Sequence, residues 1–216
     1  MTRSIAAILP VRSFRSGKAR LTDAVDGDTR AELVRRMLDH VLTAATSASV
    51  FRQVAVVSPD PEVLAWVGLH HAGVIGLHQN ELAPGLLAAL DQGRAWVVAQ
   101  GHDALAILFA DLPVVTAADI RTLVATEGTV VLAPDQLGTG TNAMLLRSDG
   151  LELADFVFQF GPGSFAAHLT EAARLELTPA VVRSAGLAFD LDTPSDLAQL
   201  QQHFGTHVMR SGRTAS

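Results

Sequence analysis

The sequence predicts an α/β fold, a three-layer sandwich built on a mostly parallel sheet. Short apolar runs free of charge, the kind buried on both faces of a parallel sheet, alternate along the chain with helical patterns. The clearest run covers residues 104–110 and ends abruptly at Asp111, with Pro113 two positions later. No linker, repeat or low-complexity block divides the 216 residues, so we expect one domain over residues 1–208 and a disordered tail at 209–216.

Apolar runs bounded by Pro, Gly or Asp predict strands at 4–9, 51–58, 74–77, 104–110, 129–133, 143–147 and 181–183, and a further extended segment that ends at 189–194. Apolar residues recurring every three or four positions predict helices at 29–45, 61–71, 85–99, 116–126, 165–174 and 194–203. Thr29, with Glu32 three residues on, has the spacing of a capping box. Thr116 and Thr193 are the expected caps of the fourth and the last helix.

Composition excludes several classes of protein. Lys and Arg number 16 against 22 Asp and Glu, a formal net charge of -6, so a general electrostatic affinity for nucleic acid is not expected. The absence of cysteine excludes disulfides, thiolate nucleophiles and cysteine-ligated zinc, and it suits a reducing compartment. No apolar run approaches the roughly 20 residues of a membrane span. The chain also enters its first strand pattern without the apolar region of a signal peptide, so we expect a cytoplasmic protein.

A basic loop follows the first predicted strand. Arg12, Arg15, Lys18 and Arg20 all fall within residues 11–21, and Lys18 is the only lysine in the chain. Cationic side chains directly after a first strand suit a bound polyphosphate, and the alternative is a solvated loop that happens to be basic. The loop lacks both the Gly-x-Gly-x-x-Gly pattern of dinucleotide dehydrogenases and the P-loop pattern.

Three carboxylates mark the ends of extended segments. Asp111 ends the 104–110 run, and Asp190 and Asp192 stand near the end of a later one. Open α/β sheets place ligands at the carboxyl ends of their strands, and one or two carboxylates with substrate phosphates suit Mg²⁺. The alternative is that these residues only cap the helices that follow them.

Two glycine-containing loops complete the candidate site. Residues 138–142 (Gly-Thr-Gly-Thr-Asn) offer backbone N–H groups to an anion, and residues 161–164 (Gly-Pro-Gly-Ser) precede a helix whose N-terminus would meet one. Each loop could also be a plain turn. The eight histidines show no metal-ligand spacing and are expected mostly at the surface; His168, one turn past Ser164, is the exception of interest.

Taken together, the motifs resemble the guanylyltransferases of deazaflavin-coenzyme (coenzyme F-420) biosynthesis, which act on 2-phospho-L-lactate or phosphoenolpyruvate. The resemblance runs from about residue 4 to 200 and implies the Rossmann-like fold of nucleotide-diphospho-sugar transferases. It rests on Leu9-Pro-Val-Arg12, Gly17-Lys18-Ala-Arg20-Leu21, Ala110-Asp111-Leu-Pro113, Ala133-Pro-Asp135, Gly138-Thr-Gly-Thr-Asn142, Phe160-Gly-Pro-Gly-Ser-Phe165 and Asp190-Leu-Asp-Thr-Pro194.

The resemblance implies that the chain joins GMP from GTP to a small phosphorylated three-carbon acid and releases pyrophosphate. It assigns catalysis to Lys18, Arg20 and Asp111, and nucleotide binding to Arg12, Lys18 and Gly85. It assigns Mg²⁺, the implied cofactor, to Asp111 with Asp192 or Asp190, and the acid substrate to Thr141, Gly161 and Ser164.

Two departures and several alternatives accompany this assignment. The chain reads Leu87 where relatives often have Asn, which puts a polar contact to the guanine or ribose in doubt. It reads Arg12 where many relatives have Lys, which keeps the charge but changes the geometry of the donors. Phosphoenolpyruvate is the first choice of acid, with 2-phospho-L-lactate and 3-phosphoglycerate as alternatives.

Rival functions are guanylylation of a molybdenum cofactor, which usually needs a Gly-rich first loop, and a catalytically silent nucleotide-binding regulator. A homodimer and transfer of the product to a downstream transferase are left open.

Overall fold

A computed structural model describes residues 3–22 and 24–204. These residues form a seven-stranded sheet in the order β3-β2-β1-β4-β6-β5-β7. The order reverses between β1 and β4, which pair in parallel, so a crevice opens at their carboxyl ends. The tail expected at 209–216 lies outside the described residues.

The strands lie close to the predicted ranges. They are β1 (Ile5–Pro10), β2 (Gln53–Ser58), β3 (Val74–His78), β4 (Ala104–Leu108), β5 (Val130–Pro134), β6 (Thr141–Arg147) and β7 (Ala180–Val181). Strands β1, β4, β5 and β6 are buried almost throughout, as the charge-free apolar runs predict. Alternate residues of β1 join different cores: Ala7 and Leu9 face one layer of helices, and Ala6 and Ile8 face the other.

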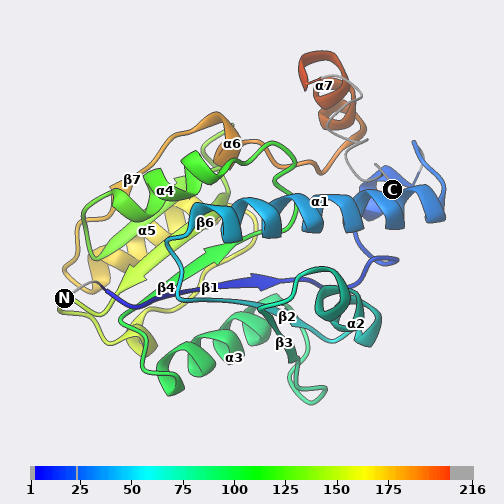
Figure 1. Ribbon diagram of the computed structural model, residues 1–216. Coiled ribbons are helices and arrows are strands. Elements are labelled where there is room, and N and C mark those ends of the chain that lie inside the picture. The colour runs from blue at the N-terminus through cyan, green and yellow to red at the C-terminus, as the bar shows by residue number, and fades with distance from the viewer. Residues whose placement is uncertain (1–2, 23, 205–216) are drawn as a thin grey trace.

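Helices cover both faces of the sheet and complete the predicted three layers (Figure 1). The longer helices are α1 (Gly27–Ala48), α2 (Pro61–His70), α3 (Leu86–Ala99), α4 (Ala117–Ala125), α5 (Ser164–Arg174) and α7 (Pro194–Phe204). The short ones are α6 (Ala185–Ala188), η1 (Ala19–Leu21) and η2 (Leu153–Asp155). Helices α1, α2 and α4 pack on one face, and α3 and α5 on the other. Gly93 lets α3 approach β1 closely, because a Cβ there would lie 2.7 Å from Ile8 Cδ1.

Strand β6 is the exception to the parallel arrangement. It lies antiparallel to both β4 and β5, with Leu108 opposite Ala143 and Ala133 opposite Ala143 on the two sides. An antiparallel strand brings its beginning, not its end, to the edge where its parallel neighbours finish. Thr141 and Asn142 therefore lie at the same edge as the carboxyl ends of β1, β4 and β5.

Two local predictions are wrong. The first helix begins at Gly27 with Asp26 as its cap, and Asp26 accepts hydrogen bonds from both the backbone and the hydroxyl of Thr29. The Thr29 capping box does not form, because a better cap stands three residues earlier. The extended segment before Pro194 is interrupted by α6 and forms no strand among the described residues.

The expected caps of the fourth and the last helix are present. Thr116 and Asp119 form a capping box on α4, and Thr193 exchanges bonds with Asp196 at the start of α7. Thr116 and Thr193, and not the three aspartates, cap these two helices. The alternative that Asp111, Asp190 and Asp192 are only caps is therefore wrong. No helix in the described part of the chain combines the length and apolar character needed to cross a bilayer.

Candidate active site

Lys18 joins the two acidic segments that the sequence places 81 residues apart, at Asp111 and Asp192. Its Nζ lies 2.5 Å from Asp111 Oδ2 and 2.5 Å from Asp192 Oδ1. The segments are also tied through the backbone, where the N–H of Leu191 donates to the carbonyl of Asp111 at 3.1 Å. The Lys18 side chain is only 10% exposed, so the alternative of a merely solvated basic residue is wrong for this lysine.

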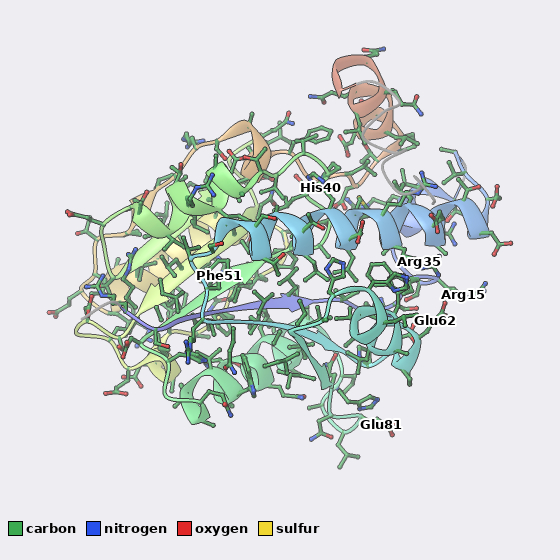
Figure 2. All side chains as sticks on the ribbon, in the orientation of Figure 1. Arg15, Arg35, His40, Phe51, Glu62 and Glu81 are labelled. Atoms are coloured by element: carbon green, nitrogen blue, oxygen red, sulfur yellow. The ribbon has the colours of Figure 1, made fainter. Side chains whose placement is uncertain are left out.

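The backbone of the basic loop is held in place by apolar anchors. Phe14 is fully buried, packs edge-on to Trp66 and lies under the guanidinium of Arg35, which also pairs with Glu62. Figure 2 shows Arg35 and Glu62 at this end of the molecule. Lys18 itself adopts a left-handed backbone (φ 54°), which is unusual for a residue with a side chain and is typical of functional sites.

The charge state of Lys18 follows from its surroundings. Burial alone would lower the pKa of the ammonium, but the charges and hydrogen bonds of Asp111 and Asp192 outweigh it, so the pKa is raised above its ordinary value. Lys18 is therefore a permanent cation between two carboxylates at neutral pH.

The three arginines of the basic loop lie in different places relative to the site. Arg20 lies 3.8 Å from Asp192, with its side chain 76% exposed. Arg12 is exposed and lies on the other side of the site. Arg15 turns away and pairs with Asp28 of α1 at 3.5 Å, so the structure does not bring it to the site.

A cavity of about 420 Å³ lies beside the Lys18 cluster. Its walls come from residues that the sequence places in six separate segments: Arg20, Leu86, Phe109, Asp111, Asp135, Thr139, Gly140, Thr141, Asn142, Phe160, Gly161, Pro162, Gly163, Ser164, Asp190 and Asp192. The structure thus brings both glycine loops and all three candidate carboxylates to one cavity.

In the loop at residues 138–142, the backbone N–H groups make hydrogen bonds within the protein, contrary to the expectation from the sequence. The N–H groups of Thr139 and Gly140 donate to the carboxylate of Asp135, and that of Gly138 donates to the Asp135 carbonyl. Burial raises the pKa of Asp135, but these bonds outweigh it and the pKa lies below its ordinary value. The prediction that these N–H groups bind an anion is wrong, because Asp135 already occupies them.

The hydroxyls of Thr141 and Ser164 lie where the two glycine loops meet. The backbone N–H of Thr141 donates to Ser164 Oγ at 2.9 Å, and Thr141 Oγ1 lies 2.9 Å from His168 Nδ1. All three side chains are at least 95% buried, although Thr141 and Ser164 line the cavity. His168 is therefore not a surface histidine.

Gly161 offers a donor of a different kind. It lines the cavity with a φ of 142°, and within the described residues its backbone N–H donates to no other group. The first N–H groups of α5 are used internally, since Ser164 donates to Gly161 and Phe165 to Thr139. The helix terminus itself is thus less available to an anion than its sequence suggests.

The three candidate carboxylates are not equivalent. Asp190 accepts a hydrogen bond from Asn142 at 3.2 Å, and burial raises its pKa, with further contributions from the charges of Asp111 and Asp192. Across the described residues no group of three or more acidic or histidine side chains is arranged to hold a metal ion by itself. Mg²⁺ can be held by one or two carboxylates together with substrate phosphates, so Asp111 and Asp192, both now paired with Lys18, remain the candidates for such a site.

A second, larger cavity of about 790 Å³ lies at the ends of β1, β2 and β3. It is lined by Pro10, Val11, Arg12, Val57, Pro59, Gln79, Asn80, Glu81, Pro84, Gly85, Leu86 and Ala89. Leu86 lines both cavities, so they adjoin. Gly85 is the N-cap residue of α3, with a φ of 104° and no side chain to cap the helix, which leaves the N-terminus of α3 open at this wall.

Several wall residues were not found from the sequence. Gln79 is 4% exposed and holds the loop before α3 by donating to the carbonyls of Ala83 and Gly85. Glu81 stands on the same loop, below the sheet in Figure 2. Their signal was a polar triplet, Gln-Asn-Glu, directly after the third strand, the position where α/β sheets bind ligands.

Solved structures share this fold. A protein from Desulfovibrio desulfuricans described as a nucleotide-diphospho-sugar transferase superposes with a TM-score of 0.75 at 15% identity, covering 95% of this chain and 94% of its own. A nucleotidyl transferase from Methanothermobacter superposes with a TM-score of 0.65 at 17% identity, covering 97% and 99%. The expected nucleotide-diphospho-sugar-transferase type of fold is confirmed.

Sequence comparison is more specific. Phosphoenolpyruvate guanylyltransferases from Rubrobacter xylanophilus and Sphaerobacter thermophilus are each 43% identical to this chain, covering 94% and 91% of it and 96% and 92% of their own lengths. The 2-phospho-L-lactate guanylyltransferase of Methanothermobacter thermautotrophicus is 33% identical, covering 94% of this chain and 86% of its own. The family model "Guanylyl transferase CofC like" matches residues 5–210. The chain therefore belongs to the CofC-like guanylyl transferase family, and the predicted guanylyltransferase class is confirmed.

Proposed function

We propose that this guanylyltransferase transfers GMP from GTP to phosphoenolpyruvate and releases pyrophosphate, as a step of deazaflavin-coenzyme biosynthesis. The observation that carries the proposal is the pair of adjoining cavities at one sheet edge, with the Lys18 cluster beside the smaller one. A reaction between two substrates needs two such spaces that meet at a charged centre. The names of the relatives at 43% identity support the choice of acid.

The larger cavity is assigned to the guanosine. Its walls combine apolar side chains with the polar groups of Gln79, Asn80 and Glu81, the mixture that a flat base with several hydrogen-bonding edges requires. Gly85 and the N-terminus of α3 then face the triphosphate, because uncapped N–H groups and the helix dipole favour negative charge. Arg12, on the same wall, adds a cation.

The smaller cavity is assigned to the acid. The hydroxyls of Thr141 and Ser164 and the N–H of Gly161 present three donors from one wall, which suits a carboxylate. Arg20 lies on the side of the cluster, where the acid's phosphate would approach the nucleotide.

The chemistry is a displacement at phosphorus. An oxygen of the acid's phosphate forms a bond to the α-phosphorus of GTP, the bond from that phosphorus to the bridging oxygen breaks, and pyrophosphate leaves with the electron pair. Such transfers depend on positioning and charge neutralisation more than on covalent catalysis. Lys18 and Arg20 supply fixed positive charge where the phosphates meet.

Magnesium completes the proposed site. Asp111 and Asp192 would hold the ion, and Asp190, already bonded by Asn142, would be the weaker candidate. When bound, the ion neutralises the phosphate oxygens and favours departure of pyrophosphate. The product, with its new phosphate-to-phosphate linkage, would be consumed by a downstream transferase.

The decisive experiment is pyrophosphate release with each of GTP, ATP, CTP and UTP crossed against phosphoenolpyruvate, 2-phospho-L-lactate and 3-phosphoglycerate. We expect release with GTP and phosphoenolpyruvate above every other pairing. Faster release with 2-phospho-L-lactate would transfer the assignment to that acid. Binding of GTP without release in any pairing would favour the silent regulator instead.

A further inference from the structure

His168 lies behind the wall of the smaller cavity and touches neither cavity. It is fully buried on α5, with Phe160 packed edge-on against its ring at 4.6 Å between centroids. Ser164, His168 and Glu171 stand at positions i, i+4 and i+7, on one face of α5, and all three are buried. Buried polar residues on a helix face need partners, and the partners of His168 carry the inference.

The ring of His168 is bonded at both nitrogens. The backbone N–H of Gln159 donates to Nε2 at 3.0 Å, and Nδ1 lies 2.9 Å from Thr141 Oγ1. A backbone N–H can only donate, so Nε2 must be without a proton. A neutral imidazole has one ring proton, so that proton lies on Nδ1 and is donated to the Thr141 hydroxyl oxygen.

The ring stays neutral under ordinary conditions. Burial lowers the pKa of His168 to about 4, although the nearby Glu171 carboxylate acts in the opposite direction. Glu171 is itself occupied, since it accepts from the backbone N–H of Val157 and from Arg174. A second ring proton would also face the N–H of Gln159, which is a donor against a donor.

The Thr141 hydroxyl must donate its own proton to a group other than His168. A hydroxyl has one donor hydrogen, and Thr141 Oγ1 already accepts from His168. The Ser164 hydroxyl likewise already acts as an acceptor, because its Oγ accepts a hydrogen bond from the N–H of Thr141. Among the described residues neither hydroxyl donates to another group, and both line the cavity.

We propose that His168 is a positioning residue: its bond to Thr141, fixed by Gln159, makes the Thr141 hydroxyl a donor into the smaller cavity, where with Ser164 it binds the carboxylate of the acid substrate. The step from donor to carboxylate binding rests on the proposed function. The tautomer does not, because it follows from the hydrogen bonds of the protein alone.

The tautomer is measured first, on the unliganded wild-type protein, by ¹⁵N NMR of the histidine rings. The proposal expects a protonated Nδ1, a bare Nε2, and no titration of His168 between about pH 5.5 and 8. A proton on Nε2, or a charged ring in this range, overturns it. This result stands even if the wild-type protein transfers GMP to none of the acids, an outcome that would refute the proposed function separately.

Kinetics with a matched pair of amides then tests the positioning role. The nitrogen of an Asn side chain reaches about as far as Nδ1, whereas that of Gln reaches about as far as Nε2. We expect His168→Gln to raise the KM for the acid about tenfold and to change the KM for GTP less than about twofold. His168→Asn should stay within about threefold of wild type for both.

A Thr141→Val background separates positioning from general damage. With the hydroxyl gone, His168→Gln should change the acid KM by less than about twofold, because the two residues act through one interaction. Full additivity of the two substitutions, or equal changes in both KM values, overturns the proposal. If His168→Gln does not fold, His168→Asn carries the test alone: its nitrogen keeps the bond to Thr141 Oγ1, so a KM for the acid that rises well beyond threefold while the KM for GTP is unchanged overturns the proposal.

Discussion

The two ends of the smaller cavity are built in different ways. At one end, Lys18, Asp111 and Asp192 are joined by ion pairs between full charges that come from distant segments. At the other, Thr141, Ser164 and His168 are joined by hydrogen bonds between neutral groups that are almost wholly buried. The first end is partly open, with Asp192 44% exposed, whereas the second is closed behind its wall.

This difference indicates that the two ends have different roles in the reaction. An ammonium shared between two carboxylates can exchange partners when phosphates and a metal ion arrive, so the acidic end is suited to a changing charge distribution. Buried neutral hydrogen bonds are costly to leave unmade, so the hydroxyl end is already organised before any ligand binds. Substitutions at the acidic end should affect kcat, and those at the hydroxyl end should affect the KM of one substrate.

Asp111→Asn should have the largest effect. It removes a charge that pairs with Lys18 and that we assign to the metal, so kcat should fall on the order of a hundred- to a thousandfold at saturating magnesium. The measurement is steady-state pyrophosphate release. Asp91→Asn, the same chemical change at an exposed residue of α3 that pairs with Arg94, is the matched control and should leave kcat unchanged. Near wild-type activity of Asp111→Asn would refute the metal assignment.

His168, at the hydroxyl end, should make the free energy of unfolding depend on pH. The pKa of His168 is about 4 in the folded protein and about 6.5 in the unfolded chain, so the unfolded state binds more protons between these values. The contribution is fully present above about pH 6.5 and is lost as the pH falls toward 4, by roughly 3 kcal/mol in total. Urea unfolding of wild type and His168→Asn across this window measures it, as the difference between the two pH profiles. Parallel profiles would contradict the assignment.

Ser164→Ala should have a moderate effect confined to one substrate. It removes one of the hydroxyls on the cavity wall, so we expect the KM for the acid to rise about tenfold while that for GTP changes less than about twofold. Ser47→Ala, an exposed position on α1, controls for the loss of a hydroxyl. A larger rise in the KM for GTP would place the acid elsewhere.

Leu87→Asn should have the smallest effect. Leu87 is 43% exposed in the first turn of α3, beside the wall of the larger cavity. If relatives use the amide at this position to contact the nucleotide, restoring it should lower the KM for GTP by up to about threefold and leave that for the acid unchanged. Initial rates at varied GTP test this, and an increased KM would show that the leucine is not a lost contact.

Much of the fold could be predicted because its signals are local. The apolar run ending at Asp111, the helix caps at Thr116 and Thr193, and the alternation of strands and helices each depend on neighbouring residues alone. The wrong cap at Thr29 shows the limit of this information, because Asp26, three residues earlier, is also a good capping residue and the pattern does not rank the two positions. The candidate carboxylates and glycine loops could likewise be found from residue type and position.

The sequence by itself thus determined the layers, the strand ends and the residue types at the site. Only the tertiary structure decided how those residues are used. It placed the start of antiparallel β6 beside the end of β4, gave the loop N–H groups to Asp135 rather than to a ligand, and inserted Lys18 between two carboxylates. Periodicity reports which face of an element is buried, but pairing between distant strands and competition among hydrogen-bond donors depend on the whole folded chain.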